Sequence, residues 1–209
     1  MATVDAEKKL QKRVLHWLVN DLGYTYLGNL EDIDNTPVKE DLLKANLKKR
    51  GYSDDQIKTA ISELLSKVNN QVDTLYQINR SVYSLLRYGR QGVKDEHGQR
   101  ETVHYIEWDT DKIDENDFYV AEEVSVLRYD RVTRKRPDVV LYVNGIALGV
   151  FELKSSYVSA GKGIRQMLQN QKRENILNFF GTAQFLFAGN EAEGLFYGTT
   201  DTPEKYYLK

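Results

Sequence analysis

Apolar residues recur at helical spacing in four stretches of the first ninety residues, and residues that commonly start or stop helices lie between them. The second stretch follows Thr36-Pro37, a pair typical of a helix start, and the third follows Ser53 and Gln56, which have capping-box spacing. The expected helices run from Val4 to Leu22, from Pro37 to just before Gly51, from Asp54 through Val68 and from Leu75 to Gly89. Residues 1–90 are therefore predicted to be a mostly helical N-terminal part, whose first helix packs on the rest of the chain.

After Gly89 the pattern changes to short runs rich in tyrosine, valine and isoleucine, which favour β-strands. One helical pattern, from Ile164 to Phe180, interrupts these runs. The candidate strands are Thr102–Trp108, Asp117–Arg128, two strands within Pro137–Lys154, Phe185–Ala188 and Leu195–Gly198. This order predicts an α/β (α+β) fold, in which helices flank a mixed sheet and residues 91–200 form the core. Residues 201–209 are expected to begin the connection to a further region.

Two apolar runs between residues 139 and 153 flank Asn144-Gly145, the strongest short-range signal for a β-hairpin. Charged residues stand at the outer ends of both runs, where burial of an unpaired charge is costly. Asp138 opens the first run, and Glu152 and Lys154 close the second. Because side chains alternate along a strand, Glu152 and Lys154 are predicted to point to the same face.

The length of the hairpin turn decides whether Asp138 lies on that face too. A strict two-residue turn without a bulge sets the two acids on opposite faces, whereas one more loop residue shifts the register and reverses the face. We predict a three-residue turn of residues 143–145, which puts Asp138 opposite Val150 and diagonal to Glu152. The bases of the two acidic side chains would then lie about 5 to 8 Å apart, close enough to share one cation.

The composition is that of a soluble globular protein and removes several classes of function. Of the 209 residues, 41% are hydrophobic and 29% are charged, and no run is long enough to span a membrane or resembles a signal peptide. The absence of cysteine excludes disulfides and thiolate metal sites and favours a cytoplasmic protein, while the three scattered histidines argue against a zinc cluster. A net charge of −2 argues against a general polyanion binder.

The chemistry expected at the hairpin is hydrolysis of a phosphodiester with Mg²⁺. Magnesium prefers oxygen ligands and keeps several waters, so one or two carboxylates and a substrate phosphate suffice to bind it. Asp138 and Glu152 supply such a pair, and the carbonyl of Leu153 is a candidate third oxygen. The cation would lower the pKa of a bound water, and Lys154 would orient that water or stabilise charge on the phosphate. The structural alternative is that Asp138 caps a turn and that Glu152 and Lys154 form a surface ion pair.

A basic segment leads directly into Asp138. Arg134, Lys135 and Arg136 are expected to position the phosphates of DNA beside the acids. The basic clusters at residues 8–13 and 48–50 have a simpler explanation as solvated helix faces.

At Pro137-Asp138 and Glu152-Leu153-Lys154 the sequence resembles the PD-(D/E)xK nuclease superfamily. The surrounding residues are more specific: the chain is similar to the N-terminal nuclease domain of the restriction (R) subunit of type I restriction-modification enzymes. The segments that carry this resemblance are Asn116-Asp117-Phe118, Arg136-Pro137-Asp138, Tyr142-Val143-Asn144-Gly145, Phe151-Glu152-Leu153-Lys154, Gly163-Ile164-Arg165-Gln166, Phe179-Phe180, Ala188-Gly189-Asn190, Gly198-Thr199 and Thr202-Pro203-Glu204-Lys205-Tyr206-Tyr207.

The resemblance implies a type I site-specific deoxyribonuclease, a Mg²⁺-dependent endonuclease that cuts double-stranded DNA. Its metal and catalytic centre would consist of Asp138, Glu152 and Lys154. In this family the domain precedes an ATP-driven motor that translocates DNA, and the subunit works with methyltransferase and specificity subunits. The sequence contains no Gly-x-x-x-x-Gly-Lys-Ser/Thr motif, so ATP binding is expected in a region outside it.

Four further residues have a role that the resemblance implies or suggests. Gln166 matches the glutamine of a family motif in which tyrosine follows four residues later, but Asn170 stands at the tyrosine position. Because the two lie one helical turn apart, Asn170 could donate a hydrogen bond to DNA phosphate, with Arg165 as another DNA contact. The alternative for this helix is a solvated face without function. Glu7 is a candidate extra acid of the site, or an ordinary partner of the helix dipole.

A competing interpretation makes the chain a non-catalytic docking module. Its helical first ninety residues would then contact the motor or partner subunits through exposed apolar helix surface near Tyr24, Tyr26 and Leu27.

Overall fold

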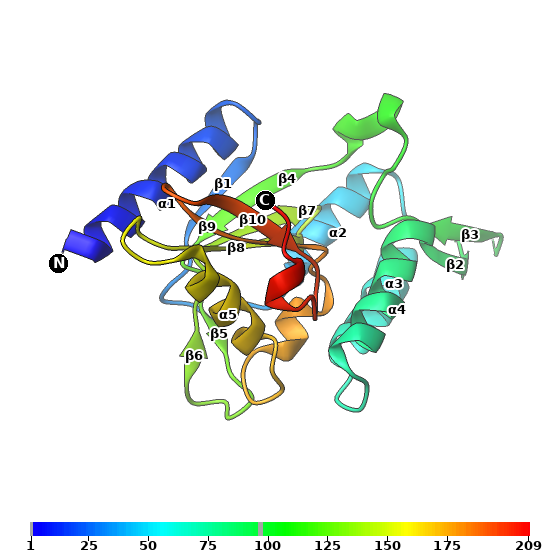
Figure 1. The fold of residues 1–209 in the computed structure, drawn as a ribbon. Helices are drawn as coiled ribbons and strands as arrows, with labels where there is room; N and C mark the ends of the chain where they lie inside the picture. Colours follow the sequence, from blue (N-terminus) through cyan, green and yellow to red (C-terminus); the bar gives the residue numbers. More distant parts are fainter. Residues whose placement is uncertain (1, 96–97) are drawn as a thin grey trace.

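A six-stranded mixed β-sheet forms the centre of the structure, a computed structural model that describes residues 2–95 and 98–209 (Figure 1). Its strand order is β1-β4-β7-β8-β9-β10, and the β1/β4 and β8/β9 pairs are parallel. The strands are β1 (Thr25–Asn29), β4 (Phe118–Glu122), β7 (Val139–Val143), β8 (Ile146–Leu153), β9 (Phe185–Asn190) and β10 (Gly194–Gly198). The expected α/β fold is confirmed, and it is consistent with the fold of PD-(D/E)xK nucleases.

Helices pack on both faces of this sheet. Leu18 in the first helix shares an apolar cluster with Phe151 of β8, whereas Met167 in the last helix shares another with Val150. Because neighbouring side chains of a strand point to opposite faces, Glu152 points to the same face as Val150. The α-helices are α1 (Ala2–Asn20), α2 (Glu40–Lys49), α3 (Asp54–Val68), α4 (Leu75–Tyr88) and α5 (Ala160–Asn170). In the described part of the chain, no helix has the length and apolar character needed to cross a membrane.

The four helices expected in the first ninety residues are confirmed, although α1 lies two residues earlier than expected and the start of α2 is corrected. The capping box at Ser53 is present and begins α3. α2 begins at Glu40, whereas Pro37 was the expected first residue. The difference arises because Val38 forms a β-bridge with Ile146, which keeps the backbone extended beside the β7–β8 hairpin.

β1 is a strand that the helical interpretation of this region missed. It pairs with β4 at the edge of the sheet, and its apolar residues do not alternate strictly along the sequence. Tyr26 and Leu27, which the docking interpretation assigns to an exposed helix surface, therefore belong to an edge strand. The boundary near residue 90 stays a prediction.

The turn of the β7–β8 hairpin differs from the predicted one, although the two acids still share a face. Val143 pairs with Ile146, so the loop contains only Asn144 and Gly145, both with positive φ (52° and 85°) as in a type I′ turn. Further along, the register shifts between Ala147 and Gly149, which leaves one extra residue in β8. With the two-residue turn alone, Asp138 and Glu152 would point to opposite faces of the sheet. The extra residue in β8 shifts the register by one, so Asp138 lies opposite Glu152 and both side chains point to the same face.

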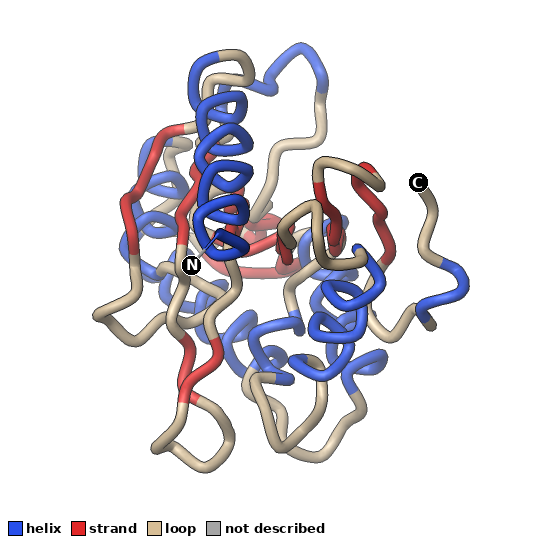
Figure 2. The backbone as a smooth tube through the Cα atoms, turned by 60° about the vertical axis from the view of Figure 1, so that its left-hand side comes forward, coloured by secondary structure: helices blue, strands red, loops and turns tan. Residues whose placement is uncertain are grey.

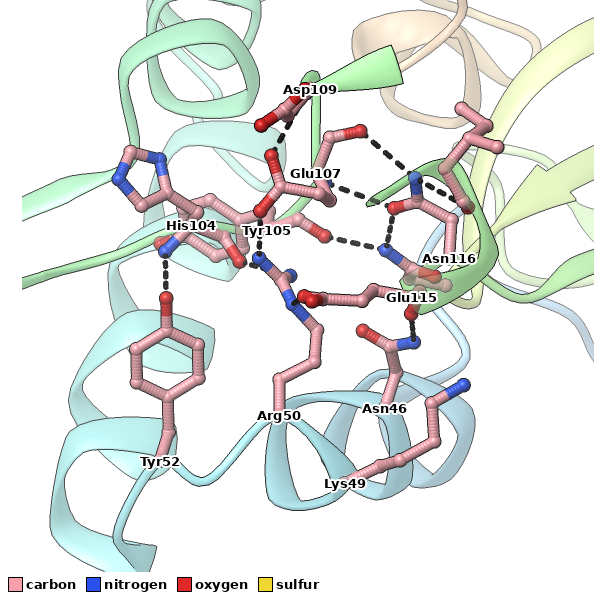
Figure 3. A network of polar contacts seen from close by, with 12 residues as sticks. Asn46, Lys49, Arg50, Tyr52, His104, Tyr105, Glu107, Asp109, Glu115 and Asn116 are labelled. Atoms are coloured by element: carbon pink, nitrogen blue, oxygen red, sulfur yellow. Dashed lines mark hydrogen bonds and ion pairs between the residues drawn. The ribbon is translucent and has the colours of Figure 1, made fainter. Parts of the chain in front are cut away.

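A buried polar network fixes this turn from outside the hairpin. The Asn144 amide donates to the carbonyl of Tyr105 and to Oδ1 of Asn116, both at 2.8 Å, while its oxygen accepts from the backbone N–H of Asp117 at 2.7 Å. Asn116 in turn bonds to the backbone of Glu107, and Figure 3 shows the surrounding contacts. These contacts account for the Asn116-Asp117 and Asn144-Gly145 motifs, which have a structural role at the end of the hairpin remote from the acids.

α5 and a 3-10 helix, Leu177–Gly181, replace the single helix expected over residues 164–180. α5 ends at Asn170, where the side-chain amide of Asn175 donates to the carbonyl of Gln169 at 2.8 Å. This bond satisfies a carbonyl that a continuing helix would have used, so the helix stops.

Two short antiparallel hairpins lie outside the central sheet. β2 (Arg90–Lys94) pairs with β3 (Arg100–Val103), so the strand expected at residues 102–108 is shorter and begins earlier. The strand expected at residues 117–128 is divided into β4 and β5, and β5 pairs with β6 in the second hairpin. The bounds of this hairpin are β5 (Val126–Leu127) and β6 (Arg134–Lys135).

Candidate active site

A pocket of about 350 Å³ opens at the end of the β7–β8 hairpin remote from the turn. It is formed by α1, the end of β4, the segment that leads into β7, the end of β8 and α5. The residues that line it are Glu7, Lys8, Gln11, Glu123, Arg134, Lys135, Arg136, Asp138, Glu152, Lys154 and Gln166. The structure thus brings together the two hairpin acids, the lysine, the basic segment, the glutamine and the extra acid that the sequence singled out.

The two acids and the lysine make close contacts at the base of this pocket. Asp138 accepts a 2.6 Å hydrogen bond from the backbone N–H of Leu153, and Lys154 Nζ lies 2.6 Å from Oε1 of Glu152. Glu152 is 1% exposed, yet its second oxygen, Oε2, has no hydrogen-bond partner among the described residues. A buried carboxylate oxygen without a donor is energetically costly, so Oε2 is suited to a cation.

Burial is the largest single influence on the pKa values of Asp138, Glu152 and Lys154. Desolvation raises the pKa of Asp138, against the opposing effects of Lys154 and the Leu153 N–H. Desolvation, and then repulsion from Asp138, raises the pKa of Glu152. Desolvation lowers the pKa of Lys154, but the combined effect of the Glu152, Asp138 and Glu7 carboxylates outweighs it, so the net shift is upward. The pocket therefore holds an ammonium beside two acids that resist ionisation, a balance that a bound cation would change.

Acidic side chains neutralise part of the basic rim of the pocket, which consists of Arg134, Lys135 and Arg136. Arg134 forms an ion pair with Asp34, and Arg136 forms ion pairs with Glu31 and, at 2.7 Å, with Glu123. The acids at positions 31 and 34 lie about a hundred residues earlier in the chain, in the segment that follows β1. Phosphate groups that approach the arginines must compete with these carboxylates.

α1 contributes three pocket residues, Glu7, Lys8 and Gln11. Sequence reasoning assigned Lys8 to a solvated helix face and missed Gln11. Glu7 Oε1 lies 4.0 Å from Lys154 Nζ, at the limit of an ion pair. Gln11, one helical turn later and only 4% exposed, donates to Glu122 at 2.7 Å and to Glu123 at 3.3 Å. Its spacing from Glu7 was the available signal, since residues four apart share a helix face.

Glu123 is a second missed residue, and no local pattern indicated it. It adopts a positive φ of 51°, unusual for a residue other than glycine, and its N–H donates to the carbonyl of Asp138. Its carboxylate contributes to the raised pKa of Asp138 and pairs with Arg136. Glu123 thus connects the buried acid to the basic rim.

The residues predicted on α5 have different environments. Gln166 is exposed and lines the pocket. Arg165 lies outside the pocket lining, where its Nη1 pairs with Glu204 Oε1 at 2.6 Å. Asn170 is 1% exposed, so the predicted DNA contact of its side chain is wrong for this conformation. The reason is its position on the inner side of the last turn of α5, with Met167 and Ile164.

The donor set available to a metal is small. Within residues 2–95 and 98–209, no group of three or more His, Cys, Asp or Glu side chains is arranged to hold a metal ion. A Mg²⁺ site here would instead use Asp138, Glu152 and the carbonyl of Leu153, with water and a phosphate completing the shell. The partnerless Oε2 of Glu152 fits this use.

Comparison with known proteins agrees with the resemblance seen in the sequence. The model of the family "Type I restriction enzyme R protein N terminus" matches residues 6–205. The chain is also similar to the "Putative type I restriction enzyme MjaIXP endonuclease subunit" of Methanocaldococcus jannaschii, with 22% identity over 200 residues. That alignment covers 91% of this chain and 19% of the archaeal protein, so the chain spans only a part of the relative's length. Because the family model covers most of its residues, the chain belongs to the family of type I restriction enzyme R protein N-terminal domains.

Proposed function

We propose that this chain is the Mg²⁺-dependent endonuclease domain of a type I restriction enzyme R subunit and hydrolyses phosphodiester bonds in double-stranded DNA. The observation that carries the proposal is the convergence of Asp138, Glu152 and Lys154 in one pocket, with a buried carboxylate oxygen that lacks a donor. A surface ion pair, the structural alternative, is less consistent with an exposure of 1% for Glu152.

Five of the pocket residues have a role in this proposal. Asp138 and Glu152 would bind the metal, which when bound supplies charge to polarise the phosphodiester and lowers the pKa of a coordinated water. Lys154 is held beside Glu152 in its charged form and would stabilise negative charge that develops on the phosphate. Gln166 is exposed at the mouth of the pocket and would donate to a phosphate oxygen. Lys135 lines the same mouth and would position the DNA backbone.

Partners outside this chain complete the proposed reaction. Cleavage would occur in concert with ATP-driven translocation by another region of the subunit, in a cytoplasmic complex with methyltransferase and specificity subunits. A pocket that contacts mainly phosphates carries little sequence information, which agrees with recognition of the DNA site by another subunit.

Mg²⁺ is expected to raise the thermal unfolding midpoint of the wild-type protein and to leave the midpoint of Asp138→Asn unchanged. At ten times the dissociation constant, a ligand that binds only the folded state adds about 1.4 kcal/mol, or roughly 3–6 °C in the unfolding midpoint. The exposed Asp201 offers a control, because Asp201→Asn removes the same charge outside the pocket lining. An equal Mg²⁺ shift in Asp138→Asn and wild type would count against metal binding at this carboxylate.

The double variant Glu31→Gln, Asp34→Asn is expected to bind duplex DNA about 3–10-fold more tightly than wild type at low salt. The reason is that both carboxylates pair with rim arginines: the variant removes the ion pair of Arg134 and leaves Arg136 only its ion pair with Glu123. Affinity is measured by fluorescence anisotropy with a random-sequence duplex in EDTA.

The matched control for this gain is the double variant Glu174→Gln, Asp201→Asn, which changes the net charge equally at two exposed positions outside the pocket lining. The same increase in both double variants would show a general charge effect. It would contradict the inference that Glu31 and Asp34 compete with phosphate for the rim arginines.

A further inference from the structure

The β5–β6 hairpin is a feature that the pocket alone does not explain. It is a two-stranded sheet separate from the central sheet, and at its base Val126 packs in the same apolar cluster as Val140 of β7. Figures 1 and 2 both show it extending away from the central sheet, with its loop at the far end. We call residues 126–135, including this loop, the β5–β6 ribbon.

The loop of the ribbon has a fixed shape. Its base is closed by a 2.8 Å bond from the N–H of Arg128 to the carbonyl of Thr133. Inside it, the Asp130 carboxylate accepts from the N–H groups of Val132 and Thr133, both at 2.9 Å. The N–H of Tyr129 donates to the carbonyl of Asn175 at 3.0 Å, which anchors the loop to the protein. A loop ordered in this way loses little entropy when it binds a partner.

The side chains at the end of the ribbon are turned to solvent. Tyr129 is 64% exposed and Val132 is 79% exposed, and Arg131 between them is also exposed. No ion pair within the described residues involves Arg131 or Lys135. From Val126 to Arg136 the chain carries five basic side chains and one acidic one. The ribbon therefore presents positive charge together with an aromatic and an aliphatic group.

This combination favours duplex DNA over a protein partner. The partner must fit the two apolar side chains, Tyr129 and Val132, and the basic charge around them. An apolar protein surface would fit only the former, whereas DNA carries phosphates along both edges of each groove. The major groove, about 12 Å wide, admits a two-stranded ribbon, and a side chain there can contact base edges and methyl groups. Ribbon shape, charge and exposed apolar end all agree with this occupant.

We propose that the β5–β6 ribbon inserts into the major groove of duplex DNA and holds the duplex with a phosphodiester at the pocket. The inference rests on the proposed function and extends it to a second contact surface. β6 runs directly from the ribbon end to the rim, because Arg134, Lys135 and Arg136 line the pocket. Asp138 follows Arg131 by seven residues, which span at most about 23 Å. That distance is less than one turn of duplex, about 34 Å.

The test uses two sets of ribbon variants, neither of which touches the acids of the pocket. Tyr129→Ser with Val132→Ser is expected to weaken binding to a random-sequence duplex about 5–10-fold in EDTA. Arg131→Gln is expected to weaken it about 3–10-fold and to reduce the salt slope of log affinity by about 1. The matched controls, Tyr83→Ser and Arg80→Gln at exposed positions of α4, are expected to bind as wild type does.

A modified duplex tests the choice of groove. Glucosylated 5-hydroxymethylcytosine fills the major groove, so wild type should bind such a duplex several-fold more weakly than unmodified DNA, and the Tyr129/Val132 variant should not distinguish the two. Unchanged affinity in the ribbon variants would overturn the proposal, as would loss of partner-subunit association in place of DNA binding. Because no metal or cleavage is involved, this result is independent of the Asp138 experiments that test the nuclease.

Discussion

Glu152→Gln is expected to abolish DNA cleavage and, in the absence of metal, to make the protein more stable. The variant keeps the shape of the side chain but removes the charge that would bind Mg²⁺, so cleavage should fall at least about 10³-fold. It also removes a buried carboxylate with a partnerless oxygen, which should add about 1–3 kcal/mol to the free energy of unfolding at pH 8 in EDTA. Function and stability thus oppose each other at this residue.

The sign of the pH dependence follows from the raised pKa values of the two acids. At a pH between the pKa of the unfolded state and the higher pKa of the folded state, each acid binds a proton in the folded protein and has lost it in the unfolded protein. The free energy of unfolding therefore falls as the pH rises from about 4.5 through the folded pKa. Metal-free wild type should lose stability over this range more steeply than Glu152→Gln.

Chemical denaturation in EDTA at pH 5 and pH 8, beside a cleavage assay, measures both effects. Glu174→Gln is the control, since it removes an exposed carboxylate outside the pocket lining and should leave stability and cleavage unchanged. If Glu152→Gln is less stable than wild type at pH 8, the ionised carboxylate is well compensated in the folded protein and its burial is not the cost we infer.

Lys154→Met is expected to lower cleavage by about 10²–10³-fold while Mg²⁺ binding is retained. The ammonium contacts Glu152 Oε1 at 2.6 Å and the carbonyl of Leu153 at 3.0 Å, but neither contact is needed to ionise the acids once a cation is bound. The loss should therefore appear in the rate of cleavage and not in the Mg²⁺-dependent shift of thermal stability.

The comparison that isolates this role is Lys162→Met, which changes another lysine, in the first turn of α5 and outside the pocket lining. Lys162→Met should cleave as wild type does. If Lys154→Met also loses the Mg²⁺ shift, the lysine organises the metal site and is not a separate contributor to catalysis.

The hairpin shows how far the sequence determined the site. Alternation predicted that Glu152 and Lys154 share a face, and Asn144-Gly145 predicted the turn, but the turn length was wrong. The acids come together because the bulge near Gly149 offsets the two-residue turn. An added Cβ at Gly149 would lie 3.1 Å from the Leu141 side chain, so close strand approach at this point uses a residue without a side chain. Such a contact across the sheet has no local signature in the sequence.

Other features of the site depend on residues far apart in the chain. Glu31 and Asp34 reach the rim arginines from the segment after β1, a strand that periodicity did not reveal. Gln11 reaches Glu123 across 112 positions. Asn170 is buried because it lies on the inner face of α5, and a side-chain bond from the next loop decides that the helix ends there. Local patterns predicted the elements and the acids, whereas tertiary packing decided which neighbours surround them.

The most direct test of the central claim is cleavage of double-stranded DNA by the complete restriction complex in Mg²⁺ and ATP, with wild type beside Asp138→Ala. ATP hydrolysis is measured in the same reactions, as the control for assembly and translocation. We expect Asp138→Ala to lose cleavage while ATP hydrolysis continues at the wild-type rate. Cleavage at the wild-type rate by Asp138→Ala would contradict the proposed nuclease, because the hairpin acids would then be structural and the chain would act as a docking module.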